Sequence, residues 1–320
     1  MPTILFYLQE GSLDVAWLDA AAALAPGYTV TMTQDEAVLA EILPDVEIMA
    51  GWSTPALIAR APGVRWVHQW SAGAEWVLAH PQVASRDFVL TNTAGIHAVP
   101  ITEHVLAMML AFARGLHHAV RAQSRRAWSY PEKRTPFELF GKTLLLVGVG
   151  GIGAHLATVA TALGMHVIGV RRNPALGAPG VALMAGPDQL QTLLPAADFV
   201  VVTLPLTTET GALFGERELQ AMRPGAYLIN IGRGAVIQEA ALVEALRAGR
   251  LAGAGLDVFE IEPLPEDSPL WALENVIITG HYAGHSPRYH ERAFETFMDN
   301  LRRYRAGEPL GNVVDKVLGY

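Results

Sequence analysis

Three ionisable residues in the second half of the chain are of the types needed to reduce a carbonyl group. Arg233 stands between two glycines, Glu262 precedes a proline, and His281 follows the last predicted strand of its region. An arginine fork binds a carboxylate with two hydrogen bonds, and a histidine held by a carboxylate can donate a proton near neutral pH. With a hydride donor, they would supply the protein's share of the reduction of a 2-keto acid.

Each of these residues also has an ordinary structural explanation when it is taken alone. Arg233 could be a surface charge beside a glycine turn, and Glu262 could belong to an exposed turn. Only the three residues together favour chemistry. A metal site made of His281 and the nearby His285 is disfavoured because no further ligands stand at a recognisable spacing, and we predict no metal.

A glycine-rich segment predicts a nucleotide cradle. The apolar run 144–147 leads into G-V-G-G-I-G at residues 148–153, which matches the G-x-G-x-x-G pattern. The first glycine permits the tight turn, the second lets the backbone approach a pyrophosphate, and the third lets helix and strand pack closely. The helix N-terminus would offer its N–H groups to the phosphates. The expected cofactor-binding residues of this segment are Gly148, Gly150, Gly151, Ile152 and Gly153.

The strand expected after this helix ends in two arginines, which indicate the type of dinucleotide. An NAD-preferring fold presents Asp or Glu there to the ribose 2′-OH, but this chain has Arg171 and Arg172. Two guanidinium groups can form charge-assisted bonds with a 2′-phosphate. We therefore expect NADPH as the cofactor and reduction as the physiological direction. If one arginine is only solvated or stacks on the adenine, NADH would be used as well.

Alternating apolar segments predict two α/β units that would position these residues. The expected strands of the first unit are 3–8, 28–32, 46–51, 64–70 and 88–91. Those that follow the glycine segment are 165–170, 199–204, 227–231, 254–258 and 276–279, with helices at 187–194, 216–222 and 238–248 between them.

The expected fold class is α/β, with two doubly wound parallel-sheet domains. A Rossmann-type dinucleotide-binding domain at residues 99–286 would be inserted in a flavodoxin-like substrate domain, residues 1–98 plus 287–320. The last expected helix, 287–305, would return the chain to the first domain.

One long apolar helix is expected over residues 99–127, ended by Pro131 and Pro136. Its length suits an element that crosses between domains or contacts a second subunit. Unpaired apolar surface on it would favour a two-fold partner, so we expect a homodimer.

Composition limits the partners and the location. The chain has 320 residues, 51% of them hydrophobic, and a formal net charge of −8 without a Lys/Arg-rich run, which disfavours nucleic acid or an anionic membrane as a partner. No apolar stretch approaches the roughly 20 residues that span a bilayer. The chain contains no cysteine, which excludes disulfides and fits a reducing compartment. We expect a cytoplasmic protein.

From about residue 65 to the C-terminal residues, the chain resembles the D-2-hydroxyacid dehydrogenase family. The matching segments are S-A-G-A at 71–74, the glycines at 148–153, L-P-L-T at 204–207 with Thr210, 230–234, D-V-F-E-I-E-P-L-P at 257–265, and 281–284. The resemblance implies that Arg233 binds substrate, that His281 is the acid/base and that Glu262 is its partner. It also implies that Asp257 orients the nicotinamide carboxamide and that the backbone at Ala72 and Gly73 holds the substrate carboxylate. Leu204 and Pro205 would lie at the cofactor.

Likeness to NADPH-linked glyoxylate/hydroxypyruvate reductases favours small 2-keto acids as substrates and D-2-hydroxy acids as products. Trp52 follows a predicted strand and is a candidate for a pocket wall, and Trp128 is a weaker one. The histidines at 97, 104, 117 and 118 are expected to be helix-surface or interface groups.

Two departures from the family pattern bear on the site. Many members have proline where this chain has Gly280, and His285 follows His281 after four residues, although the pattern histidine, any residue, alanine, glycine selects His281. The related formate dehydrogenase chemistry is disfavoured because that group has glutamine where this chain has Glu262. A cofactor-sensing binding protein or corepressor of the same fold remains an alternative, which turnover of NADPH with a keto acid would exclude.

Overall fold

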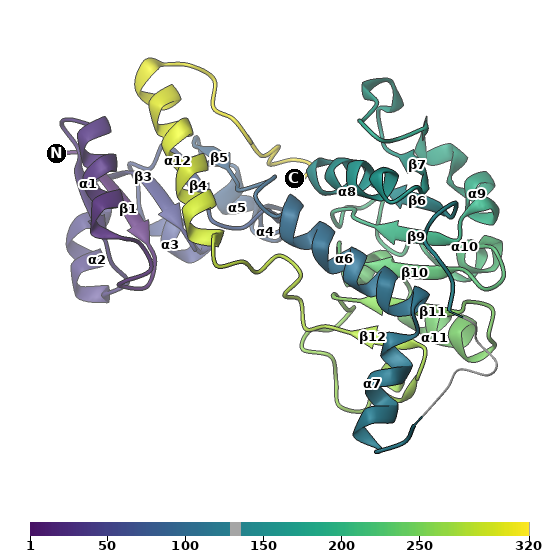
Figure 1. Ribbon diagram of the computed structural model, residues 1–320. Helices are drawn as coiled ribbons and strands as arrows, with labels where there is room; N and C mark the ends of the chain where they lie inside the picture. The colour runs from purple at the N-terminus through teal and green to yellow at the C-terminus, as the bar shows by residue number, and fades with distance from the viewer. Residues whose placement is uncertain (129–135, 320) are drawn as a thin grey trace. The chain divides into compact units, whose positions relative to one another are not determined.

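The chain divides into two compact units in the computed structural model, which describes residues 1–128 and 136–319. Unit 1 combines Met1–Ile96 with Ser286–Tyr320, and unit 2 is the intervening His97–His285. Both units contain a parallel sheet with helices, and Figure 1 labels most of their elements.

Unit 1 is built on a five-stranded parallel sheet in the order β2-β1-β3-β4-β5. This is the flavodoxin-like order that the sequence predicts. Its strands are β1 (Thr3–Tyr7), β2 (Thr29–Met32), β3 (Val46–Gly51), β4 (Trp66–Gln69) and β5 (Val89–Thr91). Its helices are α1 (Val15–Leu24), α2 (Glu36–Ile42), α3 (Pro55–Arg60), α4 (Trp76–Ala79), α5 (Pro81–Ala84) and α12 (Tyr289–Ala306).

The C-terminal helix α12 completes the core of unit 1. Its buried residues recur every three or four positions, as an amphipathic helix requires. Phe297 packs against side chains of β1 and β4, with its ring 5.2 Å from that of Trp66 and 4.9 Å from that of Phe6. The helix ends at Ala306 and is capped by Gly307, which adopts a left-handed conformation. Figure 1 shows this yellow helix beside the purple and blue elements of the N-terminal segment.

Unit 2 has a seven-stranded parallel sheet in the order β12-β11-β10-β9-β6-β7-β8. Numbered from β6, the first six strands follow the Rossmann order 3-2-1-4-5-6, and the order reverses between β6 and β9. The strands are β6 (Thr143–Val147), β7 (His166–Val170), β8 (Leu183–Ala185), β9 (Phe199–Val202), β10 (Tyr227–Asn230), β11 (Gly253–Leu256) and β12 (Val276–Ile278).

The helices of unit 2 cover both faces of this sheet, which places its strands in a continuous apolar environment. They are α6 (Ala98–Ala113), α7 (Leu116–Ser124), α8 (Gly151–Ala162), α9 (Leu190–Leu193), α10 (Glu216–Ala221) and α11 (Glu239–Arg247). Short 3₁₀ helices lie within unit 1 at Leu43–Asp45, and within unit 2 at Pro174–Leu176, Pro187–Gln189, Leu194–Ala196, Gly234–Val236 and Pro269–Ala272.

The prediction of one long helix over 99–127 is wrong. The segment forms α6 and α7, which are bent by 75° relative to each other. Gly115 separates them with a left-handed φ of 67°, a conformation that ends a helix and that glycine adopts without steric cost. Of the two prolines expected to end the helix, Pro131 lies outside the described residues, and α7 already ends at Ser124.

Within the described part of the chain, no single helix is long and apolar enough to cross a membrane. The bent pair α6 and α7 reaches that length and composition only when the two helices are counted together.

Candidate active site

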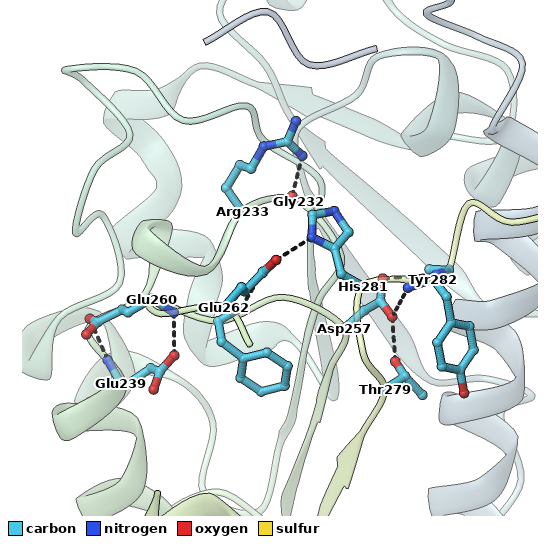
Figure 2. Close-up of polar contacts among 11 residues, drawn as sticks. Gly232, Arg233, Glu239, Asp257, Glu260, Glu262, Thr279, His281 and Tyr282 are labelled. Atoms are coloured by element: carbon cyan, nitrogen blue, oxygen red, sulfur yellow. Dashed lines mark hydrogen bonds and ion pairs between the residues drawn. The ribbon is translucent and has the colours of Figure 1, made fainter. Parts of the chain in front are cut away.

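The ionisable residues singled out in the sequence lie in loops that follow neighbouring strands of unit 2. Arg233 follows β10, Asp257 and Glu262 follow β11, and His281 follows β12. The carboxyl ends of parallel strands meet at one edge of a doubly wound sheet, where ligands bind. Figure 2 shows these side chains with their polar contacts.

His281 and Glu262 form a close pair. The Nδ1 atom of His281 lies 2.6 Å from Oε2 of Glu262, and their side chains are 49% and 35% exposed. The other carboxylate oxygen of Glu262 accepts a hydrogen bond from the backbone N–H of Phe259 at 3.0 Å. Glu262 is therefore fixed by its own loop and can fix the ring of His281.

Asp257 holds the loop that carries His281. Its carboxylate is 2% exposed and accepts hydrogen bonds from the backbone N–H groups of Tyr282 at 3.1 Å and Ala283 at 3.0 Å. Its backbone carbonyl accepts a third from the N–H of His281 at 2.8 Å. His281 itself has a left-handed φ of 56°, which is uncommon for a residue with a side chain. One residue thus binds three consecutive amides around this conformation.

Buried Asn230 shapes the loop of Arg233. Its side-chain oxygen accepts from the N–H of Gly232 at 3.1 Å, and its amide donates to the carbonyl of Arg233 at 3.0 Å. The guanidinium of Arg233 donates to the carbonyl of Gly232 at 2.8 Å. Sequence reasoning assigned no role to Asn230, although an Asn that bonds the backbone two residues onward is a local turn signal.

The Arg233 loop packs directly against the loop that carries Glu262. A Cβ atom on Gly234 would lie 1.8 Å from the carbonyl carbon of Phe259, a distance that no side chain can occupy. A Cβ on Gly232 would similarly lie 2.5 Å from the carbonyl oxygen of Leu204. These glycines therefore bring together the loops after β9, β10 and β11.

The glycine segment has the shape expected of a nucleotide cradle. Gly148 has a left-handed φ of 105°, and a Cβ on Gly153 would lie 2.4 Å from the carbonyl oxygen of Gly148, so both glycines are required by the chain itself. A Cβ on Gly150 would meet no atom within 4 Å. Helix α8 begins at Gly151 and Ile152, where its first N–H groups have no partner within the helix. The open space beside Gly150 fits a bound pyrophosphate.

Leu204 and Pro205 lie next to this cradle. They follow β9, and the hydroxyl of Thr203 donates to the carbonyl of Gly148 at 2.7 Å. This bond ties the segment that contains them to the first glycine.

The two arginines follow β7, beyond the carboxyl end of that strand. Arg171 donates from its guanidinium to the carbonyl of Gly177 at 3.1 Å. Arg172 forms an ion pair with Glu209 at 2.7 Å, and both of these side chains are exposed. The pair with Glu209 was not expected from the sequence, because the two residues come from separate loops.

The remaining sequence-predicted residues belong to unit 1. Trp52 follows β3, is 47% exposed and stacks on Tyr289, with 6.1 Å between ring centroids. The carbonyl of Ala72 accepts from the side-chain amide of Asn92 at 2.7 Å. The carbonyl of Gly73 accepts from the hydroxyl of Ser71 at 3.1 Å. These bonds order the segment after β4.

His104, which the sequence predicts as a helix-surface or interface group, is not a surface group of α6. Its side chain is only 17% exposed, and its Nε2 atom lies 3.0 Å from Oγ1 of Thr279 and 3.8 Å from the carboxylate of Asp257. Burial lowers the pKa of His104, which the negative charge of Asp257 opposes. The two hydrogen-bonded residues are 175 positions apart, so no local sequence signal could have found the contact.

Among the described residues, no cluster of three or more His, Asp or Glu side chains is arranged to hold a metal ion.

Comparison with known proteins assigns the chain to a family. The family model for the NAD binding domain of D-isomer specific 2-hydroxyacid dehydrogenases matches residues 106–283. The glyoxylate reductase of Korarchaeum cryptofilum is 33% identical over 304 residues, which cover 90% of each chain. The chain belongs to the D-isomer specific 2-hydroxyacid dehydrogenase family. The family and the α/β fold predicted from the sequence are both confirmed.

Solved structures also resemble this dehydrogenase along its whole length. A D-isomer specific 2-hydroxyacid dehydrogenase from Xanthobacter autotrophicus, in complex with NADPH and MES, superposes with a TM-score of 0.84 at 32% identity and full coverage of both chains. An NADPH-dependent glyoxylate/hydroxypyruvate reductase from Sinorhizobium meliloti, in complex with NADP and sulfate, gives a TM-score of 0.84 at 30% identity, again with both chains fully covered. The dehydrogenase is thus an oxidoreductase with a Rossmann-type NAD-binding domain.

Proposed function

We propose that this dehydrogenase reduces small 2-keto acids such as glyoxylate or hydroxypyruvate to D-2-hydroxy acids, with NADPH as the preferred cofactor and His281 as the acid/base. The observation that carries the proposal is the 2.6 Å pair of His281 and Glu262. This pair lies at the carboxyl edge of the sheet of unit 2, where the Arg233 loop and the glycine cradle also lie.

The pair of His281 and Glu262 suits proton transfer because the two ring nitrogens of His281 have different roles. The Nδ1–H of His281 donates to Glu262, which stabilises the imidazolium and leaves Nε2 to hold the proton. Nε2 gives this proton to the carbonyl oxygen of the keto acid as the oxygen gains negative charge. In the oxidation direction, neutral Nε2 accepts the hydroxyl proton instead.

Arg233 supplies the positive charge. Its guanidinium can bind the substrate carboxylate in a fork and can stabilise the developing negative charge on the carbonyl oxygen. Asn230 and Gly234 hold its loop, so the charge is preorganised before substrate arrives. The roles of Ala72, Gly73 and Trp52 in substrate binding stay predictions.

The cofactor supplies a hydride when it is bound. The glycine cradle and the N-terminus of α8 would hold its pyrophosphate, and Arg171 and Arg172 its 2′-phosphate. The two solved relatives in complex with NADPH or NADP support this choice. NADH binding would use the same cradle without the arginines. The roles proposed for Leu204, Pro205 and Asp257 at the cofactor rest on the family resemblance.

The test of the proposed function is initial-rate oxidation of NADPH and NADH with glyoxylate, hydroxypyruvate and phenylpyruvate. We expect turnover with the two small acids and a higher kcat/KM with NADPH. The double variant Arg171→Ala, Arg172→Ala should raise KM for NADPH far more than for NADH. An unchanged cofactor preference would remove the arginines from the proposal, and tight cofactor binding without turnover would contradict the reaction itself.

We also propose a homodimer. Leu110, Leu116 and Val120 of α6 and α7 are exposed apolar side chains, which a second copy of the chain could cover. Light scattering tests the assembly, and a monomeric mass would contradict it.

A further inference from the structure

We propose that His104 and Thr279 are positioning residues that hold His281 in its working orientation through the carboxylate of Asp257. The inference rests on the proposed role of His281 as acid/base. Neither residue needs to touch the substrate, because the chain of hydrogen bonds from His104 to the His281 loop runs within unit 2.

Thr279 is the middle link of this hydrogen-bond chain, between His104 and Asp257. Its hydroxyl donates to Oδ1 of Asp257 at 2.6 Å, a short bond that is typical of a charged acceptor. An ionised carboxylate has no proton to give, so the single hydroxyl proton of Thr279 is used in this bond. The hydroxyl can then only accept from His104, whose Nε2 atom lies 3.0 Å away.

This direction fixes the protonation of His104. Nε2 must carry a hydrogen, and because burial lowers the pKa of His104, the neutral form with Nδ1 unprotonated fits the site at neutral pH. The ring therefore acts as a hydrogen-bond donor with no net charge. Figure 2 shows the next links of the chain, from Thr279 through Asp257 to Tyr282.

His104 also contacts the His281 loop directly. Its ring lies edge-to-face against the ring of Tyr282, with 5.6 Å between the centroids and an angle of 88°. Tyr282 directly follows His281, and its backbone N–H is bound by the same Oδ1 atom that Thr279 contacts. Helix α6 thus supports the loop through a hydrogen-bond chain and through ring packing.

The left-handed backbone conformation of His281 explains why its loop needs these contacts. A residue with a side chain leaves such a conformation readily unless the surrounding structure over-determines it. If Asp257 turned, the amides of Tyr282 and Ala283 would lose their acceptor, and the ring of His281 would move relative to Glu262. A displaced acid lowers kcat, because proton transfer depends on the position of the ring.

The test compares two removals with two conservative replacements. Thr279→Val removes the hydroxyl and keeps the shape, whereas Thr279→Ser keeps the hydroxyl. His104→Phe keeps the ring but loses the donor, whereas His104→Gln offers an amide N–H close to the position of Nε2. His166→Gln, which changes an exposed histidine at the start of β7, is the matched control.

We expect Thr279→Val to lower kcat by about 10-fold, the size of a lost hydrogen bond to a charged group, and His104→Phe by about fivefold, because its lost bond is to a neutral hydroxyl. Thr279→Ser and His104→Gln should stay within about threefold of the parent enzyme, and the control should not change. The Kd for NADPH should stay near the parent value in all five variants, because the glycine cradle and the two arginines proposed to hold its phosphates lie outside this hydrogen-bond chain. This split between kcat and cofactor binding, together with rescue by the conservative variants, is not expected from a general loss of packing.

Two outcomes would overturn the inference: an unchanged kcat in both removal variants, or a loss in Thr279→Ser equal to that in Thr279→Val. If one removal variant does not fold, the other decides. His281→Ala, measured in parallel, separates the two proposals. If it keeps the parent kcat, the proposed function fails, whereas if it alone loses activity, only the positioning role fails.

Discussion

Gly234 and Phe259 touch through their backbones, so closely that a Cβ on Gly234 would lie 1.8 Å from the carbonyl carbon of Phe259 and 1.9 Å from its oxygen. This contact joins the loop of Arg233 to the loop of Glu262. The relative position of the proposed substrate-binding cation and the partner of His281 therefore depends on a residue without a side chain.

Replacement of Gly234 by Ala should separate these loops and lower kcat/KM by about 100-fold, the effect of a misplacement near 1 Å. The strain should also lower the free energy of unfolding by about 1–3 kcal/mol. Gly63→Ala is the matched control, because a Cβ there would meet its nearest atoms at 3.6 Å. Steady-state kinetics and urea unfolding check both effects, and parent-like kinetics for Gly234→Ala would show that the contact is unimportant.

Gly280→Ala should be tolerated, in contrast to Gly234→Ala. A Cβ on Gly280 would meet no atom within 4 Å, and the residue is not among the glycines with positive φ. The substitution restricts the unfolded chain and should stabilise the protein by about 0.4–1 kcal/mol. Thermal unfolding measures the change. A lower Tm would mean that the loop before His281 needs the freedom of glycine.

Glu209→Gln should improve the use of NADPH. Glu209 neutralises Arg172 across 2.7 Å and would repel a 2′-phosphate bound nearby. Since exposed ion pairs contribute little, we expect KM for NADPH to fall by about two- to fivefold, with KM for NADH unchanged. Glu216→Gln changes an exposed carboxylate on α10 and should have no effect. An equal change for both cofactors would argue against a role at the 2′-phosphate.

The buried His68 makes stability depend on pH. Burial lowers its pKa from 6.5 to about 3. Below pH 6.5 the His68 side chain binds a proton in the unfolded protein, but in the folded protein it stays neutral down to about pH 3. The free energy of unfolding is therefore unaffected by His68 above pH 6.5 and decreases as the pH falls from 6.5 to about 3. The expected slope is about 1.4 kcal/mol per pH unit.

Replacement by Asn isolates this effect. His68→Asn removes the titrating ring and keeps a polar atom for the hydroxyl of Thr91, which lies 2.7 Å from Nδ1 of His68. Urea unfolding between pH 5 and 7 should then give a shallower pH dependence than that of the parent. Equal slopes would mean that His68 is protonated in the folded protein.

Much of the fold is predictable because both sheets are parallel and buried. The segment 46–51 is apolar except for Glu47 and forms β3 (Val46–Gly51) with the bounds that the sequence predicts. The three-residue β8 (Leu183–Ala185) has too short a pattern to be detected. The break at Gly115 was missed because a single glycine is also tolerated inside a helix.

The candidate active site is likewise predictable where it depends on strand order, but not where it depends on how separate elements pack. Arg233, Glu262 and His281 could be grouped because parallel strands bring the loops at their carboxyl ends together, and the sequence also pairs Glu262 with His281. The contacts of His104 with Thr279 and of Arg172 with Glu209 could not be predicted, because each depends on how separate elements pack. Local patterns carry no information on such distances.

His281 transfers the proton in the proposed reaction, and the most direct test of this role is kcat for glyoxylate reduction by His281→Ala, measured beside the Kd for NADPH. We predict a fall in kcat of about 100- to 10,000-fold, as for the loss of a general acid, with an unchanged Kd. A kcat that stays near that of the parent enzyme would contradict it.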